Sequence, residues 1–133
     1  MKLEPSDKVY ISESTIPKAG RGVFAKRNIA KDEIIEICPV IEVPLDDTSN
    51  KKGAVLVDYF FYFGDRLAVA LGFGSIYNHS YKPNATYIKK LAGNIVEFKA
   101  IQNLKKYEEI TTNYNYGKAE DKSQPIQKGI PPA

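Results

Sequence analysis

The residues that could do chemistry in this chain gather in two polar runs. The first, residues 74–84, brings Asn78, His79 and Ser80 together just before a Pro-Asn turn. The second, residues 108–116, is a short β-like run that ends in a pair of tyrosines. Ser80 and His79 are the residue types of a nucleophilic pair, but adjacent residues seldom satisfy the geometry of such a pair. The sequence therefore does not favour a catalytic triad.

Cysteine and histidine are too few for several other kinds of site. Cys38 is the single cysteine, which excludes a disulfide within the chain, and one cysteine with one histidine cannot form a zinc cluster. We therefore expect no metal, and an intracellular protein that is cytoplasmic if it is bacterial. The net charge of +3 is small and the lysines are scattered, so we interpret them as a solvated surface rather than a nucleic-acid site. No apolar run approaches the roughly 18 residues of a membrane span, and the N-terminus is too polar for a signal peptide.

Two further runs carry little information on their own. Gly20 and Gly22 flank Arg21 and by themselves indicate a turn, since they match neither the dinucleotide-binding glycine fingerprint nor a phosphate loop. Residues 58–63 form a cluster of aromatic side chains. Such rings suit either a packed core or the wall of an apolar channel.

The elements that must position these runs are mostly short strands of one domain. Residues 34–43 are rich in β-branched side chains, with Pro39 marking a bend or an edge. Apolar and charged residues alternate over residues 96–100, as in a half-buried strand, and Gly93-Asn94 just before them predicts a hairpin. Residues 55–63 are the best helix candidate, although their aromatic side chains suit a strand equally well.

The chain also repeats itself loosely. Residues 28–34 resemble residues 103–110, with one extra residue in the second copy. Each copy is typical of a polar turn that leads into a strand, which supports the β interpretation.

Three runs in order, residues 20–25, 74–84 and 108–116, resemble the signature of SET-domain protein-lysine methyltransferases. That signature is G-x-G-V/L, then N-H-S/C-x-x-P-N, then E-E-L-T-x-D-Y. The resemblance implies a mostly β, β-clip-like fold of several small sheets, with a C-terminal pseudoknot and few short helices. It covers residues 8–117 as one SET domain and leaves residues 118–133 as a tail or a lid over the site. The chain is most similar to short stand-alone bacterial and viral members.

The resemblance also assigns roles to individual residues. Tyr114 would be the catalytic residue, orienting the substrate amine where cofactor and lysine meet. The cofactor S-adenosylmethionine would be bound by Gly20, Arg21, Gly22, Tyr77, Asn78, His79 and Tyr114. Asn78 would hold its ammonium or its carboxylate through the side-chain amide. Tyr59, Tyr62 and Tyr116 would line the channel for the substrate lysine.

Methyl transfer to an amine needs alignment and a dry channel more than it needs a metal or a nucleophilic side chain. The amine must be neutral, whereas free lysine has a pKa of about 10.4. A narrow apolar channel beside a cationic sulfonium disfavours the charged form, and alignment then converts binding into rate. Methyl transfer therefore needs no metal, cysteine nucleophile or catalytic triad, and the sequence offers none of these.

Two departures from the family keep an alternative open. Residues 36–39 stand where the family has E-Y-x-G, and Ile37 replaces the tyrosine that would line the lysine channel. The family's two turns have glycine near the middle, where this chain has Asp32 and Tyr107; a tyrosine adopts the left-handed conformation poorly, so the second turn is expected to differ. The alternative is a non-catalytic SET-like module that binds a protein or peptide. For the enzyme we expect a lysine-bearing histone or other protein as partner, and a homodimer is possible.

Overall fold

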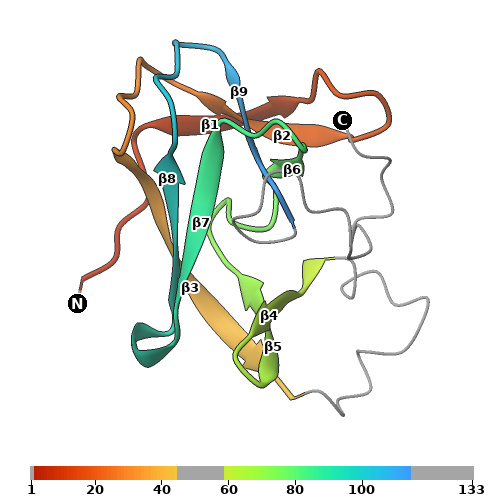
Figure 1. Cartoon of the computed structure of the whole chain (residues 1–133), viewed down its shortest axis with the longest axis vertical. Coiled ribbons are helices and arrows are strands. Elements are labelled where there is room, and N and C mark those ends of the chain that lie inside the picture. The colour runs from red at the N-terminus through yellow and green to blue at the C-terminus, as the bar shows by residue number, and fades with distance from the viewer. Residues whose placement is uncertain (1, 45–58, 115–133) are drawn as a thin grey trace.

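The computed structural model describes residues 2–44 and 59–114, and these form short strands joined by turns (Figure 1). The predicted channel residue Tyr116 and the predicted tail, residues 118–133, lie outside the described residues. The strands are β1 (Val9–Glu13), β2 (Arg21–Ala25), β3 (Ile34–Val43), β4 (Phe61–Phe63), β5 (Arg66–Ala70), β6 (Asn78–His79), β7 (Ala85–Lys90), β8 (Ile95–Ala100) and β9 (Glu109–Thr112). A 3-10 turn, η3 (Leu91–Gly93), separates β7 from β8. The predicted mostly β class is confirmed.

The strands form two sheets. One has the order β1-β2-β9-β6 and lies across the top of Figure 1, and the other has the order β4-β5-β3-β8-β7 and runs down from it. All pairs are antiparallel except β6 with β9, where Asn78 lies opposite Thr111 and His79 opposite Thr112. This parallel pair brings the Asn78-His79 run against the strand that leads to Tyr114.

The strand predicted for residues 34–43 forms as β3, and Pro39 marks the place where it changes partner. Residues up to Pro39 pair with β8, and residues from Val40 onward pair with β5. The carbonyl of Pro39 accepts a hydrogen bond from the Leu71 N–H at 2.9 Å. Because proline has no N–H to donate, a change of partner is a position that it tolerates inside a central strand.

The predicted hairpin at Gly93-Asn94 is confirmed, since β7 and β8 pair over six residues on either side of η3. Asn94 has the left-handed conformation, with φ 53°, that closes such a turn. The helix candidate at residues 55–63 is wrong in the part that is described, because Phe61–Phe63 forms strand β4. There the aromatic side chains pair across to β5, which the sequence allowed equally.

The two resembling segments form equivalent turns, which we call the first turn (residues 28–34) and the second turn (residues 103–109). They pair with each other through Ile29 and Leu104, which exchange N–H···O bonds of 2.9 and 2.8 Å. The asparagine that begins each turn accepts the backbone N–H of the fourth residue of the other turn, at 2.9 Å in both directions. The glutamate in sixth place accepts the N–H of the third residue of its own turn, at 3.0 Å in both.

These equivalent bonds correct two expectations. The second turn does not differ in geometry: Tyr107 has φ 76° and Asp32 has φ 72°, so the tyrosine adopts the left-handed conformation. The second copy also has no extra residue, since Glu33 and Glu108 make the same bonds, and Ile34 therefore corresponds to Glu109. The surrounding pairing fixes the backbone strongly enough to override the local preference of the tyrosine.

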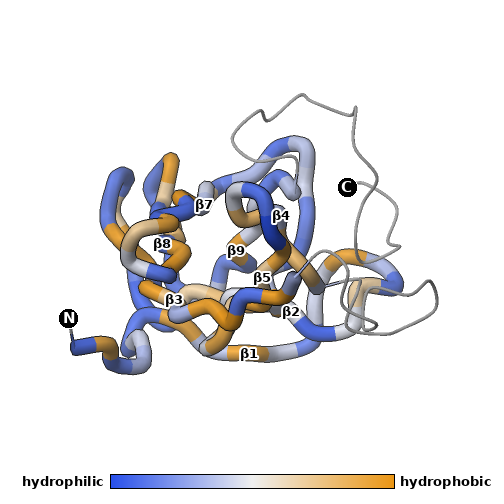
Figure 2. Tube along the Cα trace, turned by 90° about the horizontal axis from the view of Figure 1, so that it is seen from below, coloured by the Kyte–Doolittle hydropathy of each residue, from blue (hydrophilic) through white to orange (hydrophobic). Residues whose placement is uncertain are grey.

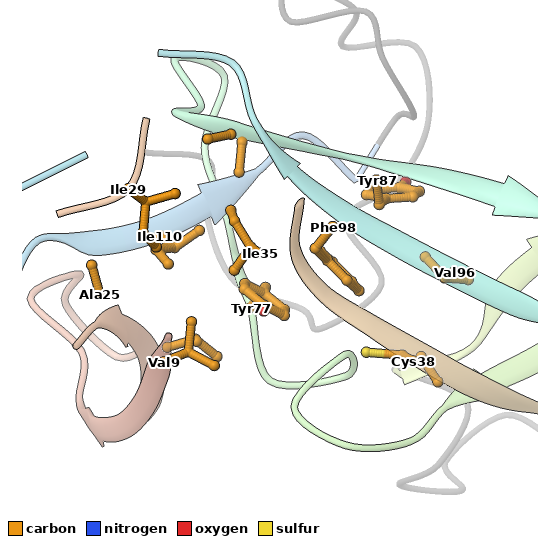
Figure 3. Close-up of a cluster of buried hydrophobic side chains, with 14 of the residues drawn as sticks. Val9, Ala25, Ile29, Ile35, Cys38, Tyr77, Tyr87, Val96, Phe98 and Ile110 are labelled. Atoms are coloured by element: carbon orange, nitrogen blue, oxygen red, sulfur yellow. The ribbon is translucent and has the colours of Figure 1, made fainter. Parts of the chain in front are cut away.

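The core lies between the two sheets and is lined by both turns. Figure 3 shows Ile29, Ile35 and Ile110 continuing into Tyr77 and Phe98, and all of these are buried. Val96, Phe98 and Ala100 of β8 are fully buried, as their alternation predicts. Figure 2 shows hydrophilic and hydrophobic stretches interleaved along the trace, as short amphipathic strands require. Among the described residues no helix has the length and apolarity needed to span a membrane.

Candidate active site

Tyr114 is held by its backbone and by its hydroxyl against the loop before β6. Its hydroxyl donates to the carbonyl oxygen of Tyr77 at 2.7 Å, and its N–H donates to Nδ1 of His79 at 3.0 Å. Its own carbonyl accepts from the hydroxyl of Tyr87 at 3.1 Å. Burial raises the pKa of Tyr114 well above its usual value, and the neighbouring Tyr87 and Tyr59 raise it further. The hydroxyl is therefore protonated and its proton is directed at a backbone carbonyl.

The imidazole of His79 is buried beside that tyrosine, with the two ring centroids 5.1 Å apart. Because Nδ1 accepts the Tyr114 N–H, the neutral ring carries its proton on Nε2. That Nε2 atom is buried and has no hydrogen-bond partner among the described residues. Burial lowers the pKa of His79 to about 4, so the ring is neutral at pH 7. A neutral ring whose basic nitrogen is already occupied cannot act as the base of a Ser-His pair.

The amide of Asn78 is fixed with its nitrogen inward. Its Nδ2 donates to the carbonyl of Arg21 at 3.0 Å and to Oε2 of Glu109 at 3.0 Å. Both hydrogens of the amide are thereby used. Its Oδ1 is buried and has no partner in the part of the chain that is described. Buried polar atoms are rarely left without a partner, so this oxygen is a place where a ligand donor fits.

The loop that leads to Asn78 rests on a buried carboxylate. Glu36 accepts the hydroxyl of Tyr77 at 2.7 Å and the N–H of Phe73 at 2.9 Å. The ring of Tyr77 stacks on Phe98 with centroids 4.1 Å apart. Burial, and then the charge of Glu36, raise the pKa of the Cys38 thiol, which is therefore not a reactive thiolate. Since the Tyr77 side chain belongs to the core, its main chain is what remains to meet a ligand.

The three residues of the first motif differ in what they offer. Gly20 has φ 75°, and no atom of the described residues lies within 4 Å of the place where its side chain would begin. A Cβ at Gly22 would instead lie 2.3 Å from Oε2 of Glu109 and 2.9 Å from Nδ2 of Asn78. Arg21 presents its carbonyl to Asn78 and exposes its side chain.

The predicted channel tyrosines lie in different surroundings. Tyr59 is near enough to Tyr114 to affect its pKa. Tyr62 lies on β4 and is 57% exposed. Between them, Phe61 packs edge-on against Tyr87 with centroids 5.2 Å apart, and Tyr87 in turn holds Tyr114. The predicted roles of Tyr59 and Tyr62 stay predictions.

The end of the first polar run is architectural. Asn84 accepts the N–H of Thr111 at 2.9 Å and donates to the carbonyl of Glu109 at 2.8 Å. The Ser80 hydroxyl accepts the N–H of Lys82 at 2.9 Å. The Asn84 bonds fix the turn against β9, and the Ser80 bond lies within the turn itself.

Sequence reasoning missed two carboxylates of the site. Glu36 and Glu109 both stand inside motifs that the sequence singled out, yet neither was given a role. For Glu36 a signal exists, because it is the one charged residue in the apolar run of residues 34–38. For Glu109, which lies in a polar run, the sequence offers no comparable signal. Within residues 2–44 and 59–114, no group of three or more His, Cys, Asp or Glu side chains could hold a metal ion.

Comparisons with known proteins show which family the chain belongs to. The family model described as the SET domain matches residues 20–115. The histone-lysine N-methyltransferase specific for H3 lysine-37 from Schizosaccharomyces pombe is 30% identical over 99 residues, which are 73% of this chain and 67% of that protein. A crystal structure of a candidate histone methyltransferase from Plasmodium falciparum is 34% identical, with a TM-score of 0.68 over 84% of this chain and 95% of that one.

More distant structures share the fold alone. One is the autoinhibited Polycomb Repressive Complex 2 of Chaetomium thermophilum bound to S-adenosylmethionine, at 20% identity and a TM-score of 0.61. The match covers 87% of this chain but 16% of that chain. The match to the family model covers well over half of the residues. The chain therefore belongs to the SET-domain family, which confirms the family that three sequence motifs predict and, with it, the class of enzyme, protein-lysine methyltransferase.

Proposed function

We propose that this chain transfers a methyl group from S-adenosylmethionine to a lysine side-chain amine of a protein. The observation that carries the proposal is the set of bonds that joins Tyr114 to the main chain of Tyr77 and the ring of His79. These bonds join the Tyr77–His79 part of the second motif to the tyrosine that closes the third. The relative from Schizosaccharomyces pombe acts on a histone lysine, which favours a histone or another lysine-bearing protein as the substrate.

The cofactor fits the polar atoms that the site leaves unpaired. Both amide hydrogens of Asn78 are already donated, so it cannot donate to a carboxylate, whereas its buried Oδ1 can accept a hydrogen bond. We therefore assign Asn78 to the ammonium group of the cofactor rather than to its carboxylate. Within residues 2–44 and 59–114, Gly20 has open space beside the main chain, and the Nε2–H of His79 is a second group without a hydrogen-bond partner. When bound, the cofactor supplies a methyl group on a sulfonium, activated for transfer to an amine.

Tyr114 would orient the substrate amine rather than remove its proton. Its own proton is donated to the Tyr77 carbonyl, so its oxygen would meet an incoming nitrogen as a hydrogen-bond acceptor. Its raised pKa argues against a phenolate base at neutral pH. The substrate lysine would instead lose its proton to water before it enters, because an apolar channel disfavours the ammonium.

A methyltransfer assay with a matched variant tests the proposal. The full chain is incubated with S-adenosylmethionine and a library of lysine-bearing proteins and peptides that includes histone H3, and methylation is read by mass spectrometry. Tyr114→Phe keeps the ring but lacks the hydroxyl, so we expect an intact fold and a rate lower by on the order of 100-fold. Tyr107→Phe makes the same change at an exposed tyrosine of the second turn and should leave the rate unchanged.

Two results would contradict the proposal. Full activity of Tyr114→Phe would remove the assigned role of that hydroxyl. An intact chain that binds peptides but neither binds S-adenosylmethionine in calorimetry nor methylates any of them would favour the non-catalytic binding module.

A further inference from the structure

The carboxylate of Glu109 lies at a junction of the site that the proposed mechanism does not use. Its Oε1 accepts the N–H of Thr15 at 2.9 Å and the Thr15 hydroxyl at 2.7 Å. Its Oε2 accepts the Ser14 hydroxyl at 2.8 Å and Nδ2 of Asn78 at 3.0 Å. Both oxygens of the carboxylate therefore act as hydrogen-bond acceptors.

The contact between Glu109 and Asn78 depends on the glycine that lies beside it. A Cβ at Gly22 would come within 2.3 Å of the carboxylate and 2.9 Å of the amide nitrogen, distances that a real side chain could not adopt. Gly22 therefore gives the two side chains room to meet over the backbone of β2. Gly22, the second glycine of the first motif, thus has a structural role that does not depend on a bound ligand.

The polarity of the Asn78 amide follows from its two partners. The carbonyl of Arg21 and the carboxylate of Glu109 are both acceptors, so the amide must present its nitrogen to them. Its oxygen is then forced to the opposite side, where it is buried without a partner among the described residues. A carboxylate is a stronger acceptor than a neutral oxygen, which makes Glu109 the stronger of the two constraints.

We infer that Glu109 is a positioning residue that fixes the orientation of the Asn78 amide, so that Oδ1 is the atom offered to the ammonium group of the cofactor. The inference rests on the proposed function. Glu109 does not touch the ligand itself and acts through Asn78. Burial raises the pKa of Glu109, but the hydrogen bonds from its neighbours outweigh burial and hold the pKa below its usual value. At neutral pH both oxygens of Glu109 are therefore acceptors.

Glu109→Gln is the variant that tests this orientation. Glutamine has one oxygen and one amide nitrogen, so if the oxygen stays with Thr15 the nitrogen faces Nδ2 of Asn78. Two donors then meet, and the Asn78 amide is driven to turn its oxygen inward and its nitrogen toward the ligand. Glu108→Gln is the matched control, because Glu108 belongs to the same turn and bonds to Asn84 but not to Asn78.

The experiment measures binding by calorimetry of two ligands that differ in a single group. One is S-adenosylhomocysteine, and the other is its deamino analogue, which keeps the carboxylate but lacks the α-amino group. For Glu109→Gln we expect the affinity for S-adenosylhomocysteine to fall about tenfold or more, as for the loss of a hydrogen bond to a charged group. The affinity for the deamino analogue should change by less than about twofold. Glu108→Gln should change neither.

The double variant shows whether Glu109 acts through Asn78. In the Asn78→Ala background, Glu109→Gln should add no further loss for S-adenosylhomocysteine, because the amide it orients is gone. An equal loss for both ligands, or an additive loss in the double variant, would overturn the inference and leave a structural role. If the intact chain binds neither ligand, it is the proposed function that fails. Should Glu109→Gln not fold, Glu109→Asp, which withdraws the carboxylate from Asn78, takes its place with the same expected selectivity.

Discussion

The first and second turns have the same backbone and differ in one decisive side chain. In both, an asparagine bonds across to the other turn, the fifth residue has a positive φ, and a glutamate accepts an N–H of its own turn. The seventh residue is Ile34 in the first turn and Glu109 in the second. Ile34 is the first residue of β3 and Glu109 the first residue of β9, but the side chain of Glu109 reaches Asn78 and Ser14.

The comparison separates what builds the fold from what builds the site. Bonds common to both turns involve backbone groups, and they fix the crossing of the chain near residues 29 and 104. The carboxylate of Glu109 has no counterpart in the first turn, and it makes no bond at that crossing. A site can thus be added to such a scaffold by changing one side chain while the backbone is kept.

The largest effect is expected from the buried isoleucine that follows each turn. Ile35 and Ile110 are 1% and 0% exposed, so Ile35→Ala and Ile110→Ala should each lower the free energy of unfolding by about 2–5 kcal/mol. If the two turns are equivalent as scaffold, the two losses should agree within about 1 kcal/mol. Urea unfolding followed by circular dichroism measures both. A loss of the full amount at one position and a negligible loss at the other would break the equivalence.

A smaller effect is expected at the fifth residue of each turn. A left-handed conformation costs a non-glycine residue roughly 1–2 kcal/mol, part of which glycine recovers. Tyr107→Gly should therefore raise the free energy of unfolding by about 1 kcal/mol. Asp32→Gly should change it little, because aspartate tolerates this conformation better.

Thermal unfolding is the measurement for this pair, and Tyr107→Phe is its control. The phenylalanine keeps the positive φ of 76° and loses only an exposed hydroxyl, so its midpoint should stay with that of the unchanged chain. A midpoint that falls in Tyr107→Gly would mean that the ring, over which Lys106 lies at 5.0 Å, stabilises the turn more than its conformation costs.

These differences also explain what the sequence could and could not predict. Strand β3, the hairpin at Gly93-Asn94 and the family follow from local patterns, in which neighbouring residues carry the information. The conformation of Tyr107 does not, because contacts from the other turn impose it. The role of Glu109 does not either: its partner Ser14 is 95 residues away, and a sequence does not say which amide hydrogen meets which carboxylate oxygen.

The smallest expected effect is on how the free energy of unfolding falls at acid pH, and it best distinguishes the two turns. The hydrogen bond from Ala30, with the bonds and charges of Lys8 and Arg27, lowers the pKa of Glu33. Burial raises the pKa of Glu109, but neutral donors outweigh this and lower it overall. A carboxyl whose folded pKa is lowered stabilises the fold above its unfolded pKa of about 4.3, and this stability is lost as the pH falls through the folded value.

Added salt should distinguish the contributions of Glu33 and Glu109 to the acid dependence of stability. We expect Glu33→Gln and Glu109→Gln each to flatten the fall in unfolding free energy between about pH 5 and pH 3. Added sodium chloride screens the partly exposed charges around Glu33, whose cationic partners lie 3.0 and 3.3 Å away, so its share of the acid dependence should shrink. The share of Glu109 should persist, because its partners are uncharged. Urea unfolding of both variants across this pH range, at low and at high salt, measures the difference. An equal loss with salt would mean that Glu109 also depends on charge, and that the two turns hold their carboxylates in the same way.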